Sequence, residues 1–186
     1  MFSINKEFID NVFTFKSNLI EDNRGWFNRL YCSEELNSIG IKDPIQQINH
    51  SYTKEKGTIR GMHFQEPPYS EVKILRCLKG SIFDVIIDLR KGSKTFLQSF
   101  KVKLSEDSYS SIVIPKGFAH GFQALEDNVE MIYFHTELYS KESEGGILYN
   151  DPFLNISWPL PVVNVSERDL SFKNITPEFK GLKIEM

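Results

Sequence analysis

The pattern of apolar and polar positions along this chain predicts strands and little helix. Short runs rich in β-branched and aromatic residues recur from end to end, separated by turn-forming residues such as Lys79-Gly80 and Glu126-Asp127-Asn128. The predicted strands cover residues 12–15, 26–32, 45–49, 58–64, 72–78, 81–89, 96–104, 110–114, 117–124 and 129–138. So many short strands at close spacing predict an all-β fold, which could be a sandwich, a jelly roll or a barrel.

Individual runs indicate how some strands are buried. Residues 100–104 alternate apolar side chains with two lysines, which predicts a half-buried antiparallel strand. Residues 82–89 are almost continuously apolar and should form a central strand. Ser33-Glu34-Glu35-Leu36, followed by Gly40, predicts a short capped helix, and Ser166-Glu167-Arg168-Asp169 predicts another near the end.

Composition narrows the class of protein. The 186 residues contain no repeat and no linker-like stretch, so residues 1–186 are expected to form a single domain. A net charge of −3 without a basic run argues against nucleic acid or a membrane surface as a partner. Cys32 and Cys77 are too few for a disulfide framework or a cysteine-rich zinc site, and no apolar leader opens the chain. A cytoplasmic protein is expected.

Two segments carry candidate chemistry. Gly57-Thr58-Ile59-Arg60-Gly61-Met62-His63-Phe64-Gln65 and Ile114-Pro115-Lys116-Gly117-Phe118-Ala119-His120-Gly121-Phe122 each place a histidine among apolar residues and glycines. A buried imidazole needs partners for its ring nitrogens and titrates near neutrality, which suits a proton shuttle. Taken alone, either histidine could equally be a hydrogen-bonded structural residue. The pair nevertheless favours an enzyme.

The same segments resemble a known family. Pro115-x-Gly117-x-x-His120 resembles the second motif of cupins, which are jelly rolls, and His63-x-Gln65 stands where metal-binding cupins carry His-x-His. The chain as a whole is similar to the dTDP-4-dehydrorhamnose 3,5-epimerases. The matching positions are Asp22-x-Arg24-Gly25-x-Phe27, Gln47-x-Asn49-His50-Ser51, both histidine segments, Lys73, Gly80-x-x-x-Asp84-Val85, Asp88-Leu89-Arg90, Ser93-x-Thr95-Phe96, Tyr133, Gly146-Ile147, Asn150-Asp151, Trp158-Pro159 and residues 166–169. The resemblance implies a cupin jelly roll with short peripheral helices.

The resemblance also implies a reaction. The family inverts C3, C5 or both in a nucleotide-linked 4-keto-6-deoxyhexose, within deoxysugar biosynthesis for surface polysaccharide. Such a reaction needs a base on one face of the sugar, a cation at the enolate oxygen and an acid on the other face. By resemblance, His63 is the base, Asp169 orients it, Lys73 is the cation and Tyr133 is the acid. No metal and no cofactor is expected.

The residues themselves leave alternatives for these roles. Asp169 could simply close the capping box that Ser166 begins, and Lys73 could be an ordinary solvent-facing lysine. Tyr133 could be a core tyrosine with a bonded hydroxyl, in which case Tyr139 is the next candidate for the acid.

The resemblance further implies how substrate is bound. Arg60, His120 and Arg24 match a clamp for the diphosphate, since guanidinium groups suit phosphate oxygens. In the family Arg24 reaches across from the neighbouring subunit, so a homodimer with shared active sites is expected. The other expected substrate-binding residues are Phe27, Arg29, Gln47, Asn49, Tyr139, Glu144 and Arg168, the last commonly a lysine in the family.

Two departures from the family concern the nucleotide base. Arg29 stands where the family has a glutamate, and a guanidinium can only donate hydrogen bonds, whereas a carboxylate could accept from N3–H of thymine. Leu138 replaces a common tyrosine. Because cytosine presents an acceptor at N3, these changes suggest an alternative function, a CDP-3,6-dideoxy-4-hexulose 5-epimerase.

Two further alternatives come from other classes. A metal-dependent cupin oxygenase or isomerase would use His63, Gln65, Glu71 and His120, but an amide is a weak ligand and Lys73 would repel a dication. A non-catalytic sugar-nucleotide-binding module would keep the jelly roll, yet binding alone does not need a base and an acid together.

Overall fold

A computed structural model describes residues 2–184. Its strands are β1 (Phe2–Lys6), β2 (Phe13–Ser17), β3 (Ile20–Asp22), β4 (Gly25–Phe27), β5 (Gln47–Thr53), β6 (Ile59–Gln65), β7 (Lys73–Lys79), β8 (Ser81–Asp88), β9 (Ser99–Ser105), β10 (Ser110–Ile114), β11 (Phe118–Ala124), β12 (Val129–His135) and β13 (Glu144–Gly146). The helices are α1 (Ser33–Asn37), the 3₁₀ turn η1 (Glu106–Ser108) and α2 (Glu167–Leu170).

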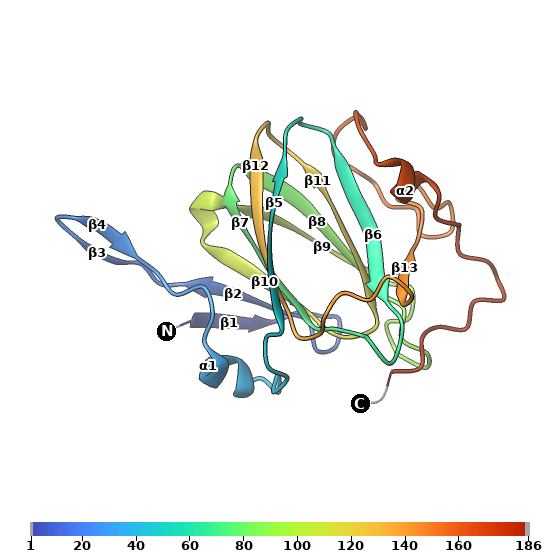
Figure 1. Ribbon diagram of the computed structural model, residues 1–186, viewed down its shortest axis with the longest axis horizontal. Coiled ribbons are helices and arrows are strands. Elements are labelled where there is room, and N and C mark those ends of the chain that lie inside the picture. The colour runs from blue at the N-terminus through green and yellow to red at the C-terminus, as the bar shows by residue number, and fades with distance from the viewer. Residues whose placement is uncertain (1, 185–186) are drawn as a thin grey trace.

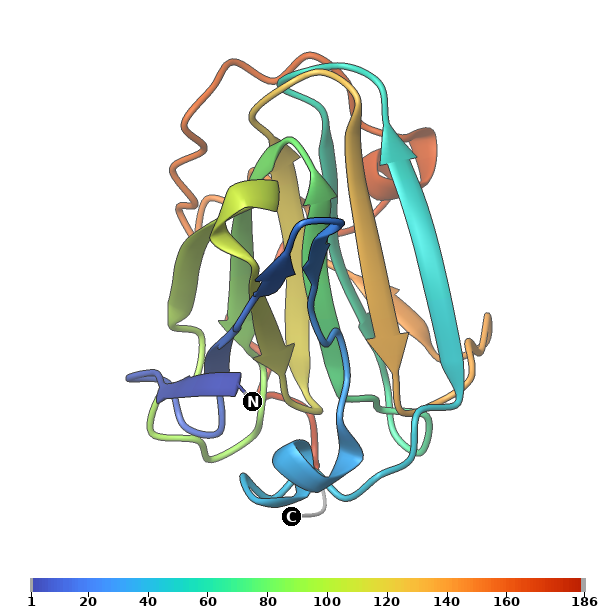
Figure 2. The same ribbon diagram turned by 90° about the vertical axis from the view of Figure 1, so that its left-hand side faces the viewer.

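Two antiparallel sheets face each other across the molecule (Figure 1). The larger has the order β1-β2-β10-β7-β12-β5, and the smaller has β13-β6-β11-β8-β9. Figure 2 shows β5 as the edge strand beside β12. This arrangement is the cupin jelly roll that the sequence predicted. The continuously apolar run at 82–89 is β8, which lies between β11 and β9 as expected of a central strand.

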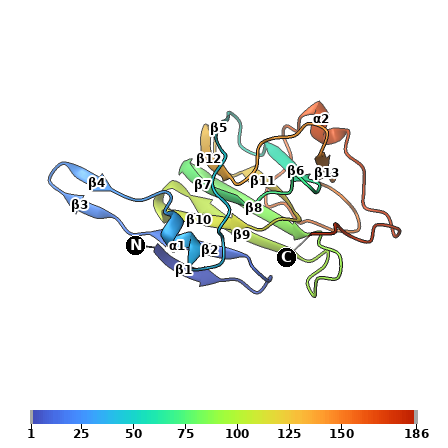
Figure 3. The same cartoon turned by 60° about the horizontal axis from the view of Figure 1, so that its bottom comes forward.

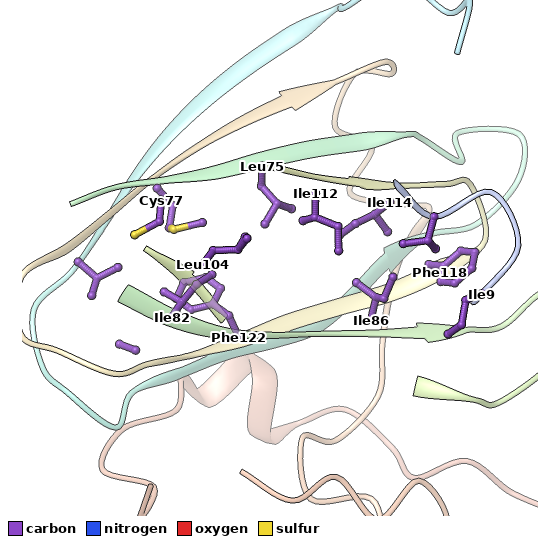
Figure 4. Close-up of a cluster of buried hydrophobic side chains, with 14 residues drawn as sticks. Ile9, Leu75, Cys77, Ile82, Ile86, Leu104, Ile112, Ile114, Phe118 and Phe122 are labelled. Carbon is purple, nitrogen blue, oxygen red and sulfur yellow. The ribbon is translucent and has the colours of Figure 1, made fainter. Parts of the chain in front are cut away.

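The main core fills the space between the sheets (Figure 4). Leu75 and Cys77 of β7 point toward Ile82 and Ile86 of β8, with Phe122 of β11 completing the layer. Each of these side chains is at most 2 % exposed. The alternating run in β9 behaves as predicted, because Leu104 is buried in this core while both lysines are exposed.

Segments outside the sheets cover part of their outer faces. On the smaller sheet, Val85 and Ile87 pack beneath Ile156, Leu182 and Trp158 of the C-terminal segment. That segment is almost entirely irregular, yet it carries α2 back to β6. The outer face of the larger sheet packs in part against α1.

The helices are as short as predicted, but only one is capped as expected. The Ser166 side chain accepts the Asp169 backbone N–H at 3.1 Å, which starts α2. At α1 the N-cap residue is Cys32, and no side chain caps it. Within residues 2–184, no helix has the length and apolar character needed to cross a membrane.

The prediction of a strand over residues 26–32 was wrong. Only Gly25–Phe27 is a strand, and it pairs with β3 as a hairpin. This hairpin, called the arm below and spanning residues 20–27, projects from the body of the protein (Figures 1 and 3). Strands β1, β3 and β13 were not predicted, and β5 extends to Thr53, four residues beyond its predicted end.

The family motif that begins at Asp88 stabilises a turn of the fold. Asp88 is fully buried at the end of β8, where its carboxylate accepts hydrogen bonds from Arg90, Ser93 and Thr95. Burial by itself would raise the pKa of Asp88, but these hydrogen bonds outweigh it and hold the pKa below its usual value. Asp88 therefore fixes the turn after β8 and is not part of the pocket described next.

Candidate active site

A cavity of about 560 Å³ opens between the two sheets. Its size is typical of pockets that bind small molecules. Strands β5, β6, β7, β11 and β12 contribute to its walls together with the segment around α2. The lining residues are Asn49, Ser51, Thr58, Ile59, Arg60, His63, Lys73, His120, Phe122, Tyr133, His135, Asn164, Ser166, Arg168 and Asp169.

Two glycines bring the two histidine segments together. On β6, Gly61 and Met62 oppose the single residue Gly121 of β11, so the register shifts there, and His63 lies opposite His120. A Cβ on Gly61 would lie 2.4 Å from the Cα of Gly121, and Gly61 has a φ of +132°. Only glycine fits this close approach, which explains why glycine accompanies histidine in both motifs.

His63 and Asp169 form a hydrogen-bonded pair at one wall. The His63 Nε2 lies 2.8 Å from Asp169 Oδ1, and the second oxygen of Asp169 accepts the Gly61 N–H at 3.0 Å. Burial alone would raise the pKa of Asp169, but the hydrogen bond and charge of His63, with the Gly61 N–H, bring it well below the usual value. The carboxylate is thus ionised and accepts the proton on Nε2, which leaves the lone pair on Nδ1 available as a base.

The pKa of His63 is lowered from 6.5. Burial of the ring is the largest cause, and the hydrogen bond and charge of Asp169 oppose it. The charge of Arg168 adds to the lowering, because its guanidinium and the Nε2–H group both donate to Asp169 Oδ1 and lie only 2.9 Å apart. Arg168 also donates to Glu144. At neutral pH the imidazole is therefore in the uncharged form that a base requires.

Lys73 and Tyr133 both point into the cavity from the larger sheet. Lys73 therefore does not face solvent. Tyr133 lies inside while Tyr139 is 54 % exposed, and Tyr133 remains the predicted acid. The Tyr133 hydroxyl lies 3.0 Å from Ser51 Oγ. Burial raises the pKa of Tyr133 to about 12, although Ser51 and Arg60 oppose the shift. Burial outweighs the effect of Arg60, so the phenol holds its proton.

His120 and Arg60 line another part of the cavity. His120 Nε2 lies 2.7 Å from Asp84 Oδ1, and both side chains are almost completely buried. Arg60 is held by Thr53 Oγ1 at 3.0 Å and by the Tyr52 carbonyl at 2.9 Å, while its side chain remains exposed. Together they offer a ring and an anchored guanidinium to an anionic ligand.

A smaller hollow of about 220 Å³ adjoins the main cavity and shares Asn49, His63, Lys73, His135 and Arg168 with it. It also contains Gln47, Tyr139 and Glu144, which the sequence had grouped as substrate-binding residues. The Gln47 oxygen accepts the Tyr139 backbone N–H at 3.2 Å, and Gln47 donates to Asn49 at 3.0 Å. The structure thus brings these predicted residues together beside the histidine pair.

Three predicted binding residues do not line the pocket of their own chain. Arg24 and Phe27 lie on the arm, and Arg29 lies between the arm and α1. Arg24 forms an exposed bidentate ion pair with Asp22, and Arg29 lies 3.4 Å from Glu35. Arg24 and Phe27 can contact a pocket only if the arm reaches another molecule.

The sequence interpretation gave no place in the epimerase site to two titratable pocket residues. His135 lines both hollows, and its partner Glu71, named only as a possible metal ligand, contacts Lys73. A signal was available, because residues two apart in a strand share a face. With Tyr133 facing inward, His135 must do so as well.

The residues of the metal-dependent alternative do not converge on one point. His63 and His120 each contact a different aspartate, and the Gln65 amide bonds to the carbonyls of Tyr69 and Leu138. In the part of the chain that the structure describes, no three His, Cys, Asp or Glu side chains are grouped to hold a metal ion.

The fold and the pocket define a cupin enzyme that moves protons on a small molecule. An uncharged imidazole hydrogen-bonded to a carboxylate, an ammonium and a neutral phenol face one cavity. Comparison with known proteins then identifies the family. The sequence profile of dTDP-4-dehydrorhamnose 3,5-epimerase matches residues 6–176. The chain belongs to this family, and it is accordingly an isomerase.

Individual relatives are similar to this chain in sequence and structure over most of its length. The dTDP-4-dehydrorhamnose 3,5-epimerase of Salmonella typhimurium is 40 % identical over 160 residues, which cover 86 % of this chain and 87 % of the relative. The crystal structure of the Bacillus anthracis enzyme with TDP and pyrophosphate has a TM-score of 0.91 at 35 % identity, covering 94 % of this chain and 100 % of that one. The Legionella pneumophila enzyme in complex with dTDP-4-keto-L-rhamnose has a TM-score of 0.92 at 34 % identity and covers both chains completely.

Proposed function

We propose that this protein epimerises a dTDP-linked 4-keto-6-deoxyhexose at C3 and C5. The observation that carries the proposal is that His63 and Tyr133 face one cavity from opposite sheets, with Lys73 in the same cavity. This is the placement needed to remove a proton from one face of a sugar ring and to return one to the other. The names of the Legionella and Salmonella relatives support the choice of substrate.

The steps follow from the geometry. The lone pair on His63 Nδ1 takes the proton from a carbon next to the C4 ketone, and the C–H electrons move into the carbonyl to give an enolate. The Lys73 ammonium stabilises the negative oxygen in a partly dehydrated site. Tyr133 then donates its hydroxyl proton to the opposite face of the carbon. The phenolate and the imidazolium exchange protons with solvent, so the cycle needs no oxidant or reductant.

Deuterium uptake tests the proposal. The protein is incubated in D₂O with dTDP-4-dehydro-6-deoxyglucose, and in parallel with a CDP-linked 4-keto sugar, and exchange is followed by NMR. Deuterium at both C3 and C5 of the dTDP sugar is expected. Exchange only at C5 of the CDP sugar would favour the cytidine alternative and would give Arg29 the role of reading the base. Exchange with neither sugar would refute the proposal.

We also propose that the protein acts as a homodimer with shared active sites. The arm supports this, since Ile20, Trp26 and Phe27 are each 58 % or more exposed on it. An apolar hairpin extending from the body is suited to contact with a second copy. Arg24 at its tip would then add positive charge to the partner's pocket, close to the diphosphate.

Complementation tests the sharing of sites. Arg24→Ala removes the arm's contribution, and His63→Ala inactivates the pocket. In a hybrid dimer of these two variants, one pocket has both an intact base and an intact arm. Random mixing of the two inactive proteins should therefore restore roughly a quarter of the wild-type activity. Lack of any recovery, although hybrids form, would contradict shared sites.

The remaining expectations concern domain organisation and cellular location. We propose that the chain works as one catalytic domain in the cytoplasm. Both cysteines, Cys32 and Cys77, are free thiols, which fits a reducing compartment. Fractionation of cells followed by immunoblotting of the protein tests this location.

A further inference from the structure

Glu71 links Lys73 to a histidine that the proposed mechanism does not use. Its Oε1 lies 3.1 Å from Lys73 Nζ, and its Oε2 lies 2.7 Å from His135 Nδ1. The three side chains are 7 %, 13 % and 13 % exposed, respectively. Burial by itself would raise the pKa of Glu71, but the hydrogen bond from His135 and the charge of Lys73 outweigh it and lower the pKa. The carboxylate is therefore ionised.

The hydrogen bonds around Glu71 all run in one direction. An ionised carboxylate only accepts, so the proton of His135 lies on Nδ1, and Nε2 accepts from the Asn49 amide at 3.3 Å. The Asn49 oxygen accepts from Gln47 at 3.0 Å, and the Gln47 oxygen accepts from the Tyr139 backbone N–H at 3.2 Å. Each donor points from the smaller hollow toward Glu71. The residues expected to hold the nucleotide and the pocket ammonium thus form one hydrogen-bonded unit.

His135 also contacts the proposed acid. Its ring lies nearly parallel to the ring of Tyr133, with centroids 6.1 Å apart. Both residues belong to β12 and face the cavity together. His135 is therefore packed against one catalytic group and bonded, through Glu71, to another.

We propose that Glu71 and His135 are positioning residues, in which Glu71 fixes the Lys73 ammonium where the enolate oxygen develops and His135 fixes Glu71. This inference rests on the proposed epimerase function. The physical reason is that a lysine side chain is flexible, whereas a charge stabilises a transition state best when it is held in place beforehand. The carboxylate supplies one anchor for the ammonium, and the imidazole prevents the carboxylate from turning away.

Kinetics with matched variants give the first test. In Glu71→Gln the amide has one acceptor oxygen for two donors, so kcat should fall by about 10- to 100-fold, the range for residues that orient a catalytic group. KM should change less than kcat, because neither side chain belongs to the proposed phosphate clamp. His135→Phe keeps a ring beside Tyr133 but loses the donor, and it should lower kcat similarly.

A rescue and a control complete the set. His135→Asn places an N–H close to the position of Nδ1 and should recover most of the kcat lost in His135→Phe. Glu126→Gln changes a carboxylate that accepts from Ser81, outside the pocket, and should keep the wild-type kcat. Unchanged kcat in Glu71→Gln or His135→Phe would overturn the inference. A variant His135→Asn no better than His135→Phe would overturn the donor role of His135.

A spectroscopic test does not depend on activity. Long-range ¹H–¹⁵N NMR distinguishes protonated from unprotonated ring nitrogens, and loss of a signal in His135→Phe assigns His135. The wild-type ring should carry its proton on Nδ1, and in Glu71→Gln the proton should move to Nε2, because the amide N–H then faces Nδ1. A wild-type proton on Nε2 would refute the hydrogen-bond direction. If the wild type fails the deuterium test, the proposed function is wrong. If it passes while the variants are unaffected, only the inference is wrong.

Discussion

Replacing Tyr133 with phenylalanine should separate proton removal from inversion. The phenol is the proposed acid on the face opposite His63, and it keeps its proton because burial raises its pKa to about 12. Without the hydroxyl, His63 can still remove a proton and return one to the same face. Exchange with solvent should therefore continue after epimerisation has nearly stopped.

The size of the effect follows from the contacts of the hydroxyl. A positioned acid contributes about 10²- to 10⁴-fold, so epimerisation should fall by that factor. The folding cost is small, since the Tyr133 hydroxyl has one hydrogen bond of 3.0 Å, to Ser51, and losing such a bond costs about 1 kcal/mol. The variant should thus remain folded while losing turnover.

One NMR experiment in D₂O measures both rates on the same sample. Deuterium incorporation into the unreacted sugar reports proton removal, and the appearance of the epimer reports inversion. The chemical denaturation midpoint controls for folding, and Ser51→Ala controls for loss of the hydrogen bond alone. If Tyr133→Phe lost exchange and inversion in equal proportion, the assignment of base and acid to opposite faces would be wrong.

Three other predictions use different parts of the structure. Activity should be lost on acidification through a pKa below 6.5, because burial lowers the pKa of His63 and only the uncharged imidazole is a base. In Asp169→Asn this acid limb of the kcat/KM profile should move to still lower pH, since Asp169 opposes the lowering of the His63 pKa. The same variant should lower kcat by about 10- to 150-fold, equivalent to a charge-assisted hydrogen bond of about 1.5–3 kcal/mol, and an unshifted profile would contradict the pairing. Arg60→Ala should raise KM by a similar factor with a smaller effect on kcat, because an exposed guanidinium anchored by backbone and hydroxyl contacts is suited to ground-state phosphate binding; an unchanged KM excludes the clamp. Asp88→Asn should lower the free energy of unfolding by about 3–5 kcal/mol, because it leaves the charge of Arg90 unpaired. Since the folded-state pKa of Asp88 is lowered, the extra stability of the wild type over this variant should be complete above pH 3.8 and disappear as the pH falls below it. Denaturation at several pH values measures this difference.

The sequence predicted the sheets better than their surroundings. Strands such as β8 and β11 were found because β-branched and aromatic runs ended at turn residues, and both lie near the middle of a sheet. Strand β13 was not predicted because two of its three residues are glycines, and they show no alternation of apolar and polar side chains. Residues 28–32 were misjudged because their apolar character serves packing beside α1, where Leu30 and Tyr31 join the outer cluster.

The site was predicted unevenly for a similar reason. His63, Lys73 and Tyr133 were found because family motifs name them, and strand alternation is consistent with their inward direction. The resemblance also named Asp169 as the partner of His63, although 106 residues separate them. It did not pair Glu71 with His135, which are 64 residues apart. Neither composition nor local spacing indicates that such pairs meet, or how burial shifts the pKa of each group.

The attachment of Asp169 has a consequence for how the enzyme would fail. The carboxylate that orients the base lies on the four-residue α2, within the irregular C-terminal segment and outside the strand ladders. Elements with few backbone ladders open locally at a lower free energy than central strands. Under mild denaturant, inactivation should therefore precede loss of the β-sheet circular dichroism signal, and protease should cut the C-terminal segment first. In this protein, loss of activity would therefore report local unfolding earlier than any signal from the two sheets.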